Sequence, residues 1–493
     1  MIEHQPGGRP EKPSETTDSG TLATEHRTTR KAVTAAAIGN ATEWYDFGVY
    51  SYLAVTIGLV FYPSQSQGVQ LIATFTTFAA AFLVRPLGGM FFGPLGDRIG
   101  RKRVLAATML LMAAGTFCIG LIPSAATIGV AAPLLLLLAR MVQGFSTGGE
   151  YGGAATFVAE YAPDERRGFL ASWLEFGTVA GYVGGAAVVT SMTLLLGPDA
   201  MLAWGWRIPF LLALPLGAIG LYLRVRLDET PVFAENTRRS AEESDGRRRK
   251  GRLRATVVGQ WHNLLLCIGL VLVFNVNNYM VTAYLPTYLE AELGYGSTTA
   301  LLLTLGAMAL MLIAVTGVGR LGDRVGRRPV LLSGSLFSIV LTLPAFWLLQ
   351  TGDTGAVALG VVLLAITLVH FSGTAPAALP ALFPTGVRYG ALAIGFNVSV
   401  ALFGGTTPLL AEALVRSTGD LYAPAWPVMV AGAVGVIVVW RMKESAGRPL
   451  PGAPAIPVPA HTPGGTRLPY PRTGGENERY VPPSNVRRLP SGP

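Results

Sequence analysis

The stretch Gly93–Arg103, GPLGDRIGRKR, recurs 226 residues later as GRLGDRVGRRP at Gly319–Pro329. Both copies keep Gly-Asp-Arg and then Gly-Arg at the same spacing, and each follows the second long apolar segment of its part of the chain. A second, shorter repeat follows the fourth apolar segment of each part, where Pro163-x-x-x-Arg167 matches Pro384-x-x-x-Arg388. A repeat of this kind predicts two equivalent halves with the same order of elements.

The composition places these halves in a membrane. The 493 residues are 51% hydrophobic and only 14% charged, with a mean hydropathy of +0.45, whereas soluble domains carry about 25% charged residues. An apolar segment needs about 20 residues to cross the hydrocarbon core. Twelve such segments lie near 32–60, 70–94, 104–123, 128–159, 168–197, 205–224, 261–290, 298–318, 329–349, 356–382, 391–415 and 423–442. We predict an all-α membrane protein with twelve transmembrane helices in two pseudo-symmetric six-helix halves, 32–224 and 261–442.

The distribution of the basic residues indicates how the chain is oriented in the membrane. Of 38 Lys and Arg, 34 lie in the N-terminal tail, in alternate loops and in the C-terminal tail, while the remaining loops hold only Arg416. The positive-inside rule then places both termini in the cytoplasm. Residues 1–31 and 443–493 are predicted to be disordered tails, the latter rich in Pro, Gly and Arg, and 225–260 a basic cytoplasmic linker. The net charge of +9 therefore does not indicate nucleic acid as a partner.

Enzyme and cofactor motifs are absent from the sequence. There is no phosphate-binding loop, no G-x-S-x-G, no H-E-x-x-H and no C-x-x-C, so ATP-driven pumping and hydrolysis lose support. His370 has no second His at ligand spacing, and the two cysteines, Cys118 and Cys267, fall in different halves. The sequence predicts no enzyme, no cofactor, no metal and no disulfide, and it leaves open whether the chain works as a monomer.

The repeated motif predicts a gate on the cytoplasmic side. A carboxylate can bind the N-terminus of an opposing helix or an arginine, and such a contact would lock one side until the halves rock. The alternative is a basic turn that only fixes topology. The predicted gating residues are Asp97, Arg98, Arg101, Arg167, Asp323, Arg324 and Arg327.

The first span contains GNATEWYDFGVYSY, Gly39–Tyr52, with Glu43 and Asp46 three residues apart on one helix face. Ionisable groups at membrane depth are costly unless they serve a partner or a pathway. Arg85 in span two and Arg140 in span four are the candidate partners. We predict that Glu43, Asp46 and Arg140 couple protons to transport, with Arg140 competing between the carboxylates and a substrate carboxylate. The alternatives are a helix-orienting polar contact and permanent structural ion pairs.

Polar residues inside spans supply candidates for solute binding, although such residues also hold membrane helices together. The predicted substrate-binding residues are Asn40, Tyr50, Arg85, Arg140, Asn275, Asn278, Tyr279 and Asn397. Trp44, Tyr45, Tyr50 and Tyr279 are candidates for an aromatic cage around a quaternary ammonium, unless they only pack or anchor the helices. Glu150 and Glu175 lie beside glycine rows and could form a secondary polar path.

The repeated G-x-L-G-D-R-x-G-R motif, together with the twelve spans, resembles the major facilitator superfamily. Further motifs resemble its metabolite:proton symporter family, and within it the branch that carries proline and glycine betaine: GNATEWYDF, RPLGG (Arg85–Gly89), RMVQGFSTGGEYGG (Arg140–Gly153), WGWRIPF (Trp204–Phe210), LDETPVF (Leu227–Phe233), TFCIGLIP (Thr116–Pro123) and LFPTGVRYGALAIGFN (Leu382–Asn397).

The resemblance implies alternating-access symport of a proton with a small zwitterionic solute, in the lipid bilayer of a bacterial cytoplasmic membrane. A proton symporter of an organic acid, such as oxoglutarate, citrate or shikimate, remains open, as does a non-transporting membrane sensor. A drug:proton antiporter is less favoured, because Gly181 is followed by Tyr182 where those proteins typically carry Gly-Pro.

Overall fold

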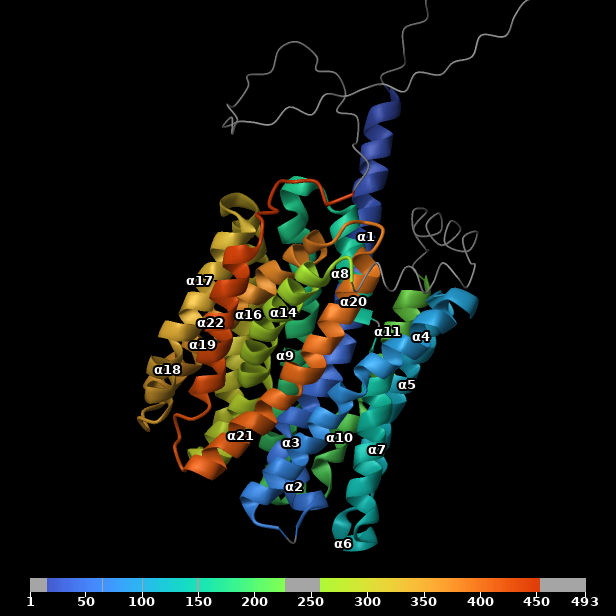
Figure 1. Cartoon of the computed structure of the whole chain (residues 1–493). Helices are drawn as coiled ribbons and strands as arrows, with labels where there is room; N and C mark the ends of the chain where they lie inside the picture. Colours follow the sequence, from blue (N-terminus) through green and yellow to red (C-terminus); the bar gives the residue numbers. More distant parts are fainter. Residues whose placement is uncertain (1–15, 64, 100, 149, 227–257, 453–493) are drawn as a thin grey trace, which may run out of the picture. The chain divides into compact units, whose positions relative to one another are not determined.

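The computed structural model describes residues 16–63, 65–99, 101–148, 150–226 and 258–452, which form helices and connecting turns without a strand (Figure 1). The first half contains α1 (Thr16–Tyr52), α2 (Ala54–Phe61), α3 (Gln67–Leu83), α4 (Arg85–Ile99), α5 (Arg101–Leu121), α6 (Ala125–Ile128), α7 (Ala131–Ser146), α8 (Glu150–Tyr161), α9 (Arg167–Ala200), α10 (Arg207–Leu211) and α11 (Ala213–Arg226). The second half contains α14 (Trp261–Tyr279), α15 (Leu285–Thr287), α16 (Ser297–Val325), α17 (Arg327–Val340), α18 (Thr342–Leu349), α19 (Thr354–Ala378), α20 (Arg388–Ser399), α21 (Thr406–Thr418) and α22 (Ala425–Arg441).

Consecutive helices join into membrane spans. Six helical stretches in the described ranges are each long and apolar enough to cross a membrane, and a seventh is the pair α17 and α18, bent by 47°. The other spans consist of shorter helices or of helices interrupted by a few residues, such as α1 with α2 and α7 with α8. Counted this way, twelve spans are present, six on each side of 227–257, and their positions follow the twelve apolar segments of the sequence.

The repeated motif is helical where the sequence analysis assigns loops. α4 continues to Ile99 and α16 to Val325, and in the second copy a single glycine separates α16 from α17. In the second copy this residue is Gly326, whose φ of 107° lies in a region that a side chain would disfavour. Most of each predicted loop, 93–103 and 319–328, is therefore the helical end of α4 or α16 rather than an irregular turn. We call the end of the bundle that carries Asp323 and Arg388 the motif side.

Both tails are shorter than predicted. α1 starts at Thr16, inside the stretch 1–31 predicted to be disordered. No proline lies between Pro13 and Pro63, so the helix of the first span can extend outward. Residues 443–452, predicted to belong to the C-terminal tail, form hydrogen bonds with both halves. Most of the linker 225–260 and the rest of the tail lie outside the described residues, as do the side chains of Asp97, Arg98 and Arg101.

Glycines let the helices of the first half approach closely. A Cβ on Gly144 of α7 would lie 1.7 Å from the carbonyl oxygen of Ala81 in α3, and one on Gly148 would lie 2.0 Å from that of Arg85. Gly177 and Gly181 bring α9 equally close to α1. Backbones can approach to this distance only where a residue has no side chain, which is how small residues pack membrane helices.

Replacing Gly144 with alanine is expected to destabilise the protein by about 1–3 kcal/mol, because the new methyl group forces α3 and α7 apart. The measurement is thermal unfolding of the purified protein in detergent. The matched control is Gly317→Ala on α16, where a Cβ would meet open space and alanine favours the helix. An unchanged melting temperature for Gly144→Ala would contradict the close approach of these two helices.

Candidate functional site

Glu43 and Arg85 form a buried ion pair in the first half. Both side chains are about 2% exposed, and Arg85 Nη2 donates to Glu43 Oε1. Arg85 Nε also donates to Thr147 Oγ1 at 2.7 Å, at the end of α7 that Gly148 brings against α4. The pair therefore links α1, α4 and α7, and the positive charge of Arg85 balances Glu43 inside the bundle.

Asp46 has a different environment. Thr116 of α5 donates from Oγ1 to Asp46 Oδ2 at 2.8 Å, and Gln143 Nε2 donates to the same hydroxyl at 2.6 Å. Arg140 Nη1 in turn donates to Gln143 Oε1. Asp46 thus connects to Arg140 through a chain of two neutral side chains, and within the described ranges no arginine or lysine pairs with it directly.

Arg140 is fully buried among aromatic rings. Its guanidinium carbon lies 4.2 Å from the ring centroid of Tyr50 and 5.1 Å from those of Phe47 and Phe78. Its Nε and Nη2 have no hydrogen-bond partner among the residues that the structure describes. A buried guanidinium with unused planar donors is suited to receive a carboxylate, so this part of Arg140 is a candidate anion contact.

An aromatic cluster joins the two halves beside this network. Trp44 of α1 lies 5.5 Å from Tyr182 of α9 and 6.1 Å from Tyr279 of α14, measured between ring centroids. Trp44 Nε1, the Tyr279 hydroxyl and the amide nitrogen of Asn275 lack partners in the described part of the chain. Three ring faces with unused polar groups can surround an organic cation.

Other predicted binding residues have their polar groups engaged elsewhere. Asn40 donates to Leu174 O and Thr178, which ties α1 to α9 within the first half. Asn397 donates to Gly148 O at 2.8 Å, a contact between the halves on the motif side. The Tyr45 hydroxyl donates to Pro209 O and so lies apart from the cluster. Asn278 faces Tyr182 across the two halves.

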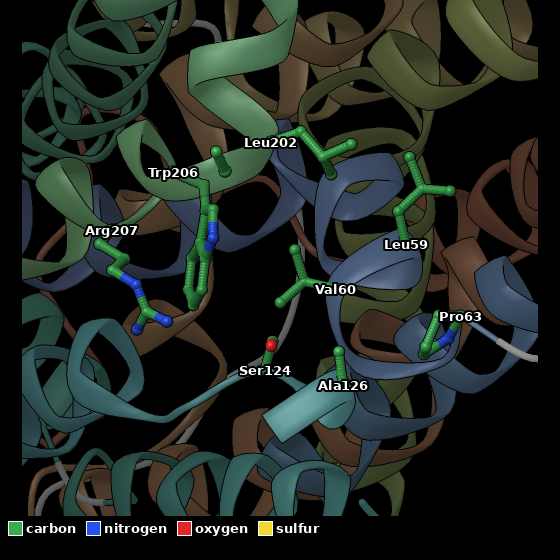
Figure 2. Close-up of a pocket in the computed structure, with 9 residues that line it drawn as sticks. Leu59, Val60, Pro63, Ser124, Ala126, Leu202, Trp206 and Arg207 are labelled. Atoms are coloured by element: carbon green, nitrogen blue, oxygen red, sulfur yellow. The ribbon is translucent and has the colours of Figure 1, made fainter. Parts of the chain in front are cut away.

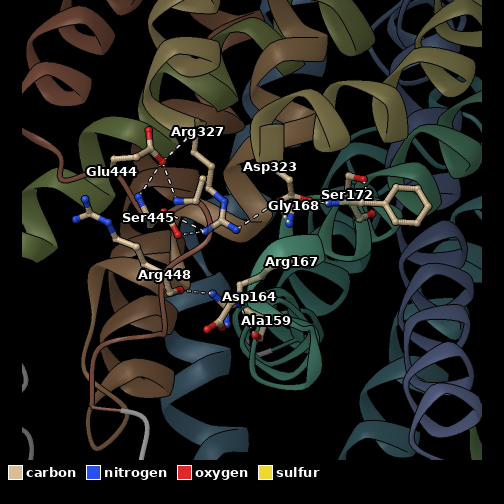
Figure 3. A network of polar contacts seen from close by, with 12 residues as sticks. Ala159, Asp164, Arg167, Gly168, Ser172, Asp323, Arg327, Glu444, Ser445 and Arg448 are labelled. Carbon is tan, nitrogen blue, oxygen red and sulfur yellow. Dashed lines mark hydrogen bonds and ion pairs between the residues drawn. The ribbon is translucent and has the colours of Figure 1, made fainter. Parts of the chain in front are cut away.

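The motif side is held closed by Asp323. Its two carboxylate oxygens accept hydrogen bonds from the backbone N–H groups of Gly168 and Phe169 at 2.7 and 2.8 Å, in the first turn of α9, as Figure 3 shows. Arg327 Nη2 lies 3.4 Å from the same carboxylate. A carboxylate at a helix N-terminus is favoured by the helix dipole, so this contact couples the second half to the first. Arg324 is exposed.

The segment after α22 crosses the same surface (Figure 3). Ser445 accepts from Arg327, while the carbonyl of Arg448 accepts from Arg167 at 3.0 Å. The carbonyl of Pro451 accepts from Arg388 at 2.8 Å. Residues 444–451 therefore connect arginines of both halves through backbone oxygens, and Arg167 belongs to this contact as well as to α9.

Glu444 anchors this segment to the start of α17. Partial burial raises the pKa of its carboxyl group, but the backbone N–H groups of Ala446, Arg328, Arg327 and Ser445 donate to it and leave the pKa below its ordinary value. A carboxyl group whose folded pKa is lowered stabilises the fold above its unfolded pKa, and this contribution is lost as the pH falls through the folded pKa.

Glu444→Gln is therefore expected to lower stability at neutral pH by about 1 kcal/mol, the usual effect of losing a helix cap. The difference from the unmodified protein should shrink in acid, below about pH 4. Thermal unfolding across this pH range is the measurement, with Glu165→Gln as control, since Glu165 is exposed on the same side. A difference that stays constant with pH would contradict the role of the ionised carboxylate.

The opposite side carries its own charged cluster. Arg416 of α21 pairs with Glu292 and with the buried Glu412, and its side chain lies over Gly68, where a Cβ would be only 2.8 Å away. A cavity of about 360 Å³ also opens on this side, within the first half alone (Figure 2). Arg207, which lines this cavity, already donates to Gly120 O and Ile122 O. The cavity is not lined by Glu43, Asp46 or Arg140.

Comparison with known proteins identifies the family of this chain. The family model described as "Sugar (and other) transporter" matches residues 32–456. The chain belongs to this transporter family. The glycine betaine/proline/ectoine/pipecolic acid transporter OusA of Dickeya dadantii is 49% identical over 427 residues, which cover 86% of this chain and 85% of the relative. The proline/betaine transporter of Escherichia coli K12 is 49% identical over 431 residues, with the same two shares.

The ectoine/proline transporter ProP of Corynebacterium glutamicum is 43% identical over 433 residues, 86% of each chain. Among solved structures, the proton:xylose symporter XylE bound to 6-bromo-6-deoxy-D-glucose matches with a TM-score of 0.68 at 18% identity, covering 86% of this chain and 98% of XylE. At this identity the match shows the fold. The predicted family and its twelve-helix fold are confirmed, and family members of this kind are transporters rather than enzymes.

Sequence reasoning missed several members of the site. Thr116 and Gln143 complete the network around Asp46, Thr147 supports Arg85, and Tyr182 completes the aromatic cluster. Gln143 follows Arg140 by three residues, so helical spacing alone could have paired them. Thr116 and Tyr182 offered no such signal, because hydroxyl and aromatic residues are common in membrane spans and their partners lie on other helices.

Proposed function

We propose that this chain is a proton-coupled symporter of small zwitterionic osmolytes, of the proline and glycine betaine type, in the cytoplasmic membrane of a bacterium. The observation that supports it best is the placement of Arg140 with unused donors beside a cluster of aromatic rings contributed by both halves. The names of the relatives, which carry proline, betaine and ectoine, point to the same class of solute.

A zwitterion needs one partner for its carboxylate and one for its cationic nitrogen. Arg140 would receive the solute carboxylate as a planar hydrogen-bonded pair. Trp44, Tyr182 and Tyr279 would surround its ammonium or quaternary nitrogen, where ring faces attract a cation without requiring a hydrogen bond. An organic acid would instead leave the aromatic cluster without a cation, so this arrangement favours the zwitterion.

Asp46 would carry the proton. Glu43 is neutralised by Arg85, so its charge is already balanced, whereas Asp46 has only the hydroxyl of Thr116 as a direct hydrogen-bond partner in the described ranges. When Asp46 is ionised, Arg140 is the nearest available cation through Gln143. When Asp46 binds a proton, its negative charge no longer offsets that of Arg140, and Arg140 attracts the solute carboxylate more strongly. Proton and solute then bind cooperatively, which is the condition for symport.

The two halves would rock about this central site. Closure on the motif side would rest on Asp323 at the start of α9, with Arg167 and Arg327 in the same contact. Asp97, Arg98, Arg101 and Arg324 remain predicted gating residues. We place the motif side, with both termini, in the cytoplasm, because 34 of the 38 Lys and Arg fall, along the sequence, in the two tails and in the set of alternate loops that includes the repeated motif. A single chain contains both halves and the whole central site.

An uptake screen with the purified full-length protein in proteoliposomes tests this function. Labelled proline, glycine betaine, oxoglutarate and citrate are offered with and without a pH gradient that is acid outside. We expect gradient-dependent accumulation of proline or betaine. Accumulation of only the organic acids would replace the substrate class, uptake indifferent to the gradient would remove symport, and the lack of counterflow for all four would favour a non-transporting sensor.

A further inference from the structure

Glu175 is a second buried carboxyl group that the mechanism above does not use. It lies on α9 and is 1% exposed, and the hydroxyl of Tyr151 donates to its Oε1 at 2.6 Å. Thr178, one turn further along α9, also lies against it. No arginine or lysine forms an ion pair with Glu175 anywhere in the described ranges. An ionised carboxylate is therefore unbalanced at this position.

Tyr151 is part of the contact that closes the motif side. Its ring stacks on Phe396 of α20 with centroids 4.0 Å apart and an interplanar angle of 11°. The next residue, Gly152, approaches Ala393 of α20 so closely that a Cβ would lie 3.2 Å from the Ala393 Cα. Asn397 adds a hydrogen bond to Gly148 O one turn along. The Tyr151 ring thus joins α8 of the first half to α20 of the second.

The hydrogen bond from the Tyr151 hydroxyl to Glu175 fixes the orientation of the Tyr151 ring. The other titratable groups facing the pair are Tyr182 on α9 and the phenol of Tyr279 and thiol of Cys267 on α14. All three are uncharged at neutral pH. Since α1, α16 and α19, which also pack on α9, bring no ion-pair partner to Glu175 within the described residues, its own protonation decides whether this contact contains a net charge.

We propose that Glu175 positions Tyr151 in the closed contact between α8 and α20, and that a proton taken from the cytoplasm by Glu175 permits this contact to close. This inference rests on the proposed function, because it assigns one step of the transport cycle. With the contact open, water reaches the ionised carboxylate. Closing removes that water, which is unfavourable for an unbalanced charge and favourable once the carboxyl group is neutral. The proton returns to the cytoplasm on opening, so Glu175 adds nothing to the transported proton count.

The first test reads closure directly and needs no solute. A reporter cysteine replaces Ala393 in full-length protein in which Cys118 and Cys267 are changed to alanine, and its labelling by a maleimide inside proteoliposomes is followed as the internal pH is raised. In the protein with Glu175 we expect labelling to rise about tenfold from acid to alkaline internal pH. Glu175→Gln should label slowly at every pH, because the amide cannot ionise. Glu165→Gln, an exposed change on the same side, should behave like the parent.

The second test uses transport. The counterflow rate of labelled proline or betaine should fall as the internal pH rises, although an alkaline interior favours proton-driven entry, and Glu175→Gln should abolish this dependence. Tyr151→Phe keeps the stacked ring but removes its hydroxyl, so it should label faster than the parent even at acid pH. If Glu175→Gln does not fold, the labelling rate of Tyr151→Phe still tests whether the hydrogen bond to Glu175 holds the contact closed.

Labelling of Glu175→Gln that follows the internal pH as the parent does would overturn the proposal. Labelling of the parent that is independent of pH would overturn it too. These outcomes are distinguishable from failure of the proposed function, because the labelling arm gives its result even if neither solute is transported.

Discussion

Replacing Arg140 with alanine is expected to lower proton-driven uptake of proline or betaine by a factor on the order of 100. The guanidinium is fully buried among the rings of Tyr50, Phe47 and Phe78, and it is the cation connected to Asp46 through Gln143 and Thr116. Truncating one partner of a buried hydrogen-bonded charge pair, here the proposed pair with the solute carboxylate, costs about 2–5 kcal/mol of binding, and 1.4 kcal/mol corresponds to a factor of ten. Alanine removes both the solute contact and the competitor for Asp46.

Arg140→Lys separates charge from geometry. Lysine keeps the positive charge but loses the planar fork and most of the ring stacking, so we expect a defect smaller than that of alanine and expressed mainly as weaker solute binding. The control is Arg207→Lys, which keeps a charge outside the central network, where Arg207 binds backbone carbonyls on the opposite side. The measurements are initial uptake rate and solute affinity at two external pH values. Normal transport by both Arg140 variants would contradict the proposed coupling.

The fold could be predicted from the sequence because the features that determine it can be counted along the chain. Apolar segments of sufficient length and the alternation of basic loops are properties of the chain itself, and the structure places the twelve spans close to the predicted positions. The motif ends were misjudged for a physical reason. The run Gly319–Gly326 is polar and reads as a loop, yet α16 continues through it to Val325, since a helix that leaves the membrane keeps its internal hydrogen bonds in water.

The candidate site was only partly accessible. Charged residues in apolar spans stand out, so Glu43, Asp46, Arg85 and Arg140 were found. Their pairing could not be read from spacing, because it depends on how far α1, α4 and α7 are rotated and how closely Gly144 and Gly148 bring them together. The structure separates the two carboxylates, with Glu43 held by Arg85 and Asp46 held by a hydroxyl. Residues with similar chemistry and neighbouring positions therefore receive different environments.

This separation leads to the second large effect. Asp46→Asn is expected to abolish accumulation of solute against its gradient while counterflow continues at a rate similar to that of the parent. Asparagine keeps the shape of the side chain and can still accept from Thr116 Oγ1, but it cannot bind and release a proton. It therefore resembles the protonated state, in which Arg140 is free for the solute. The measurements are steady-state accumulation with an imposed pH gradient and counterflow without one, in the same proteoliposomes.

Glu43→Gln is the matched comparison, because it neutralises the other carboxylate of the same helix face. Here the loss of charge leaves Arg85 buried without its counter-ion, so we expect a lower melting temperature as well as slower transport, corresponding to about 3 kcal/mol or more. Asp46→Asn should melt close to the parent, since it removes no direct ion pair. If Glu43→Gln lost coupling while keeping its stability, and Asp46→Asn still accumulated solute, the proton would have to be assigned to Glu43, and Arg85 would take the place of Arg140 in the exchange between carboxylate and solute.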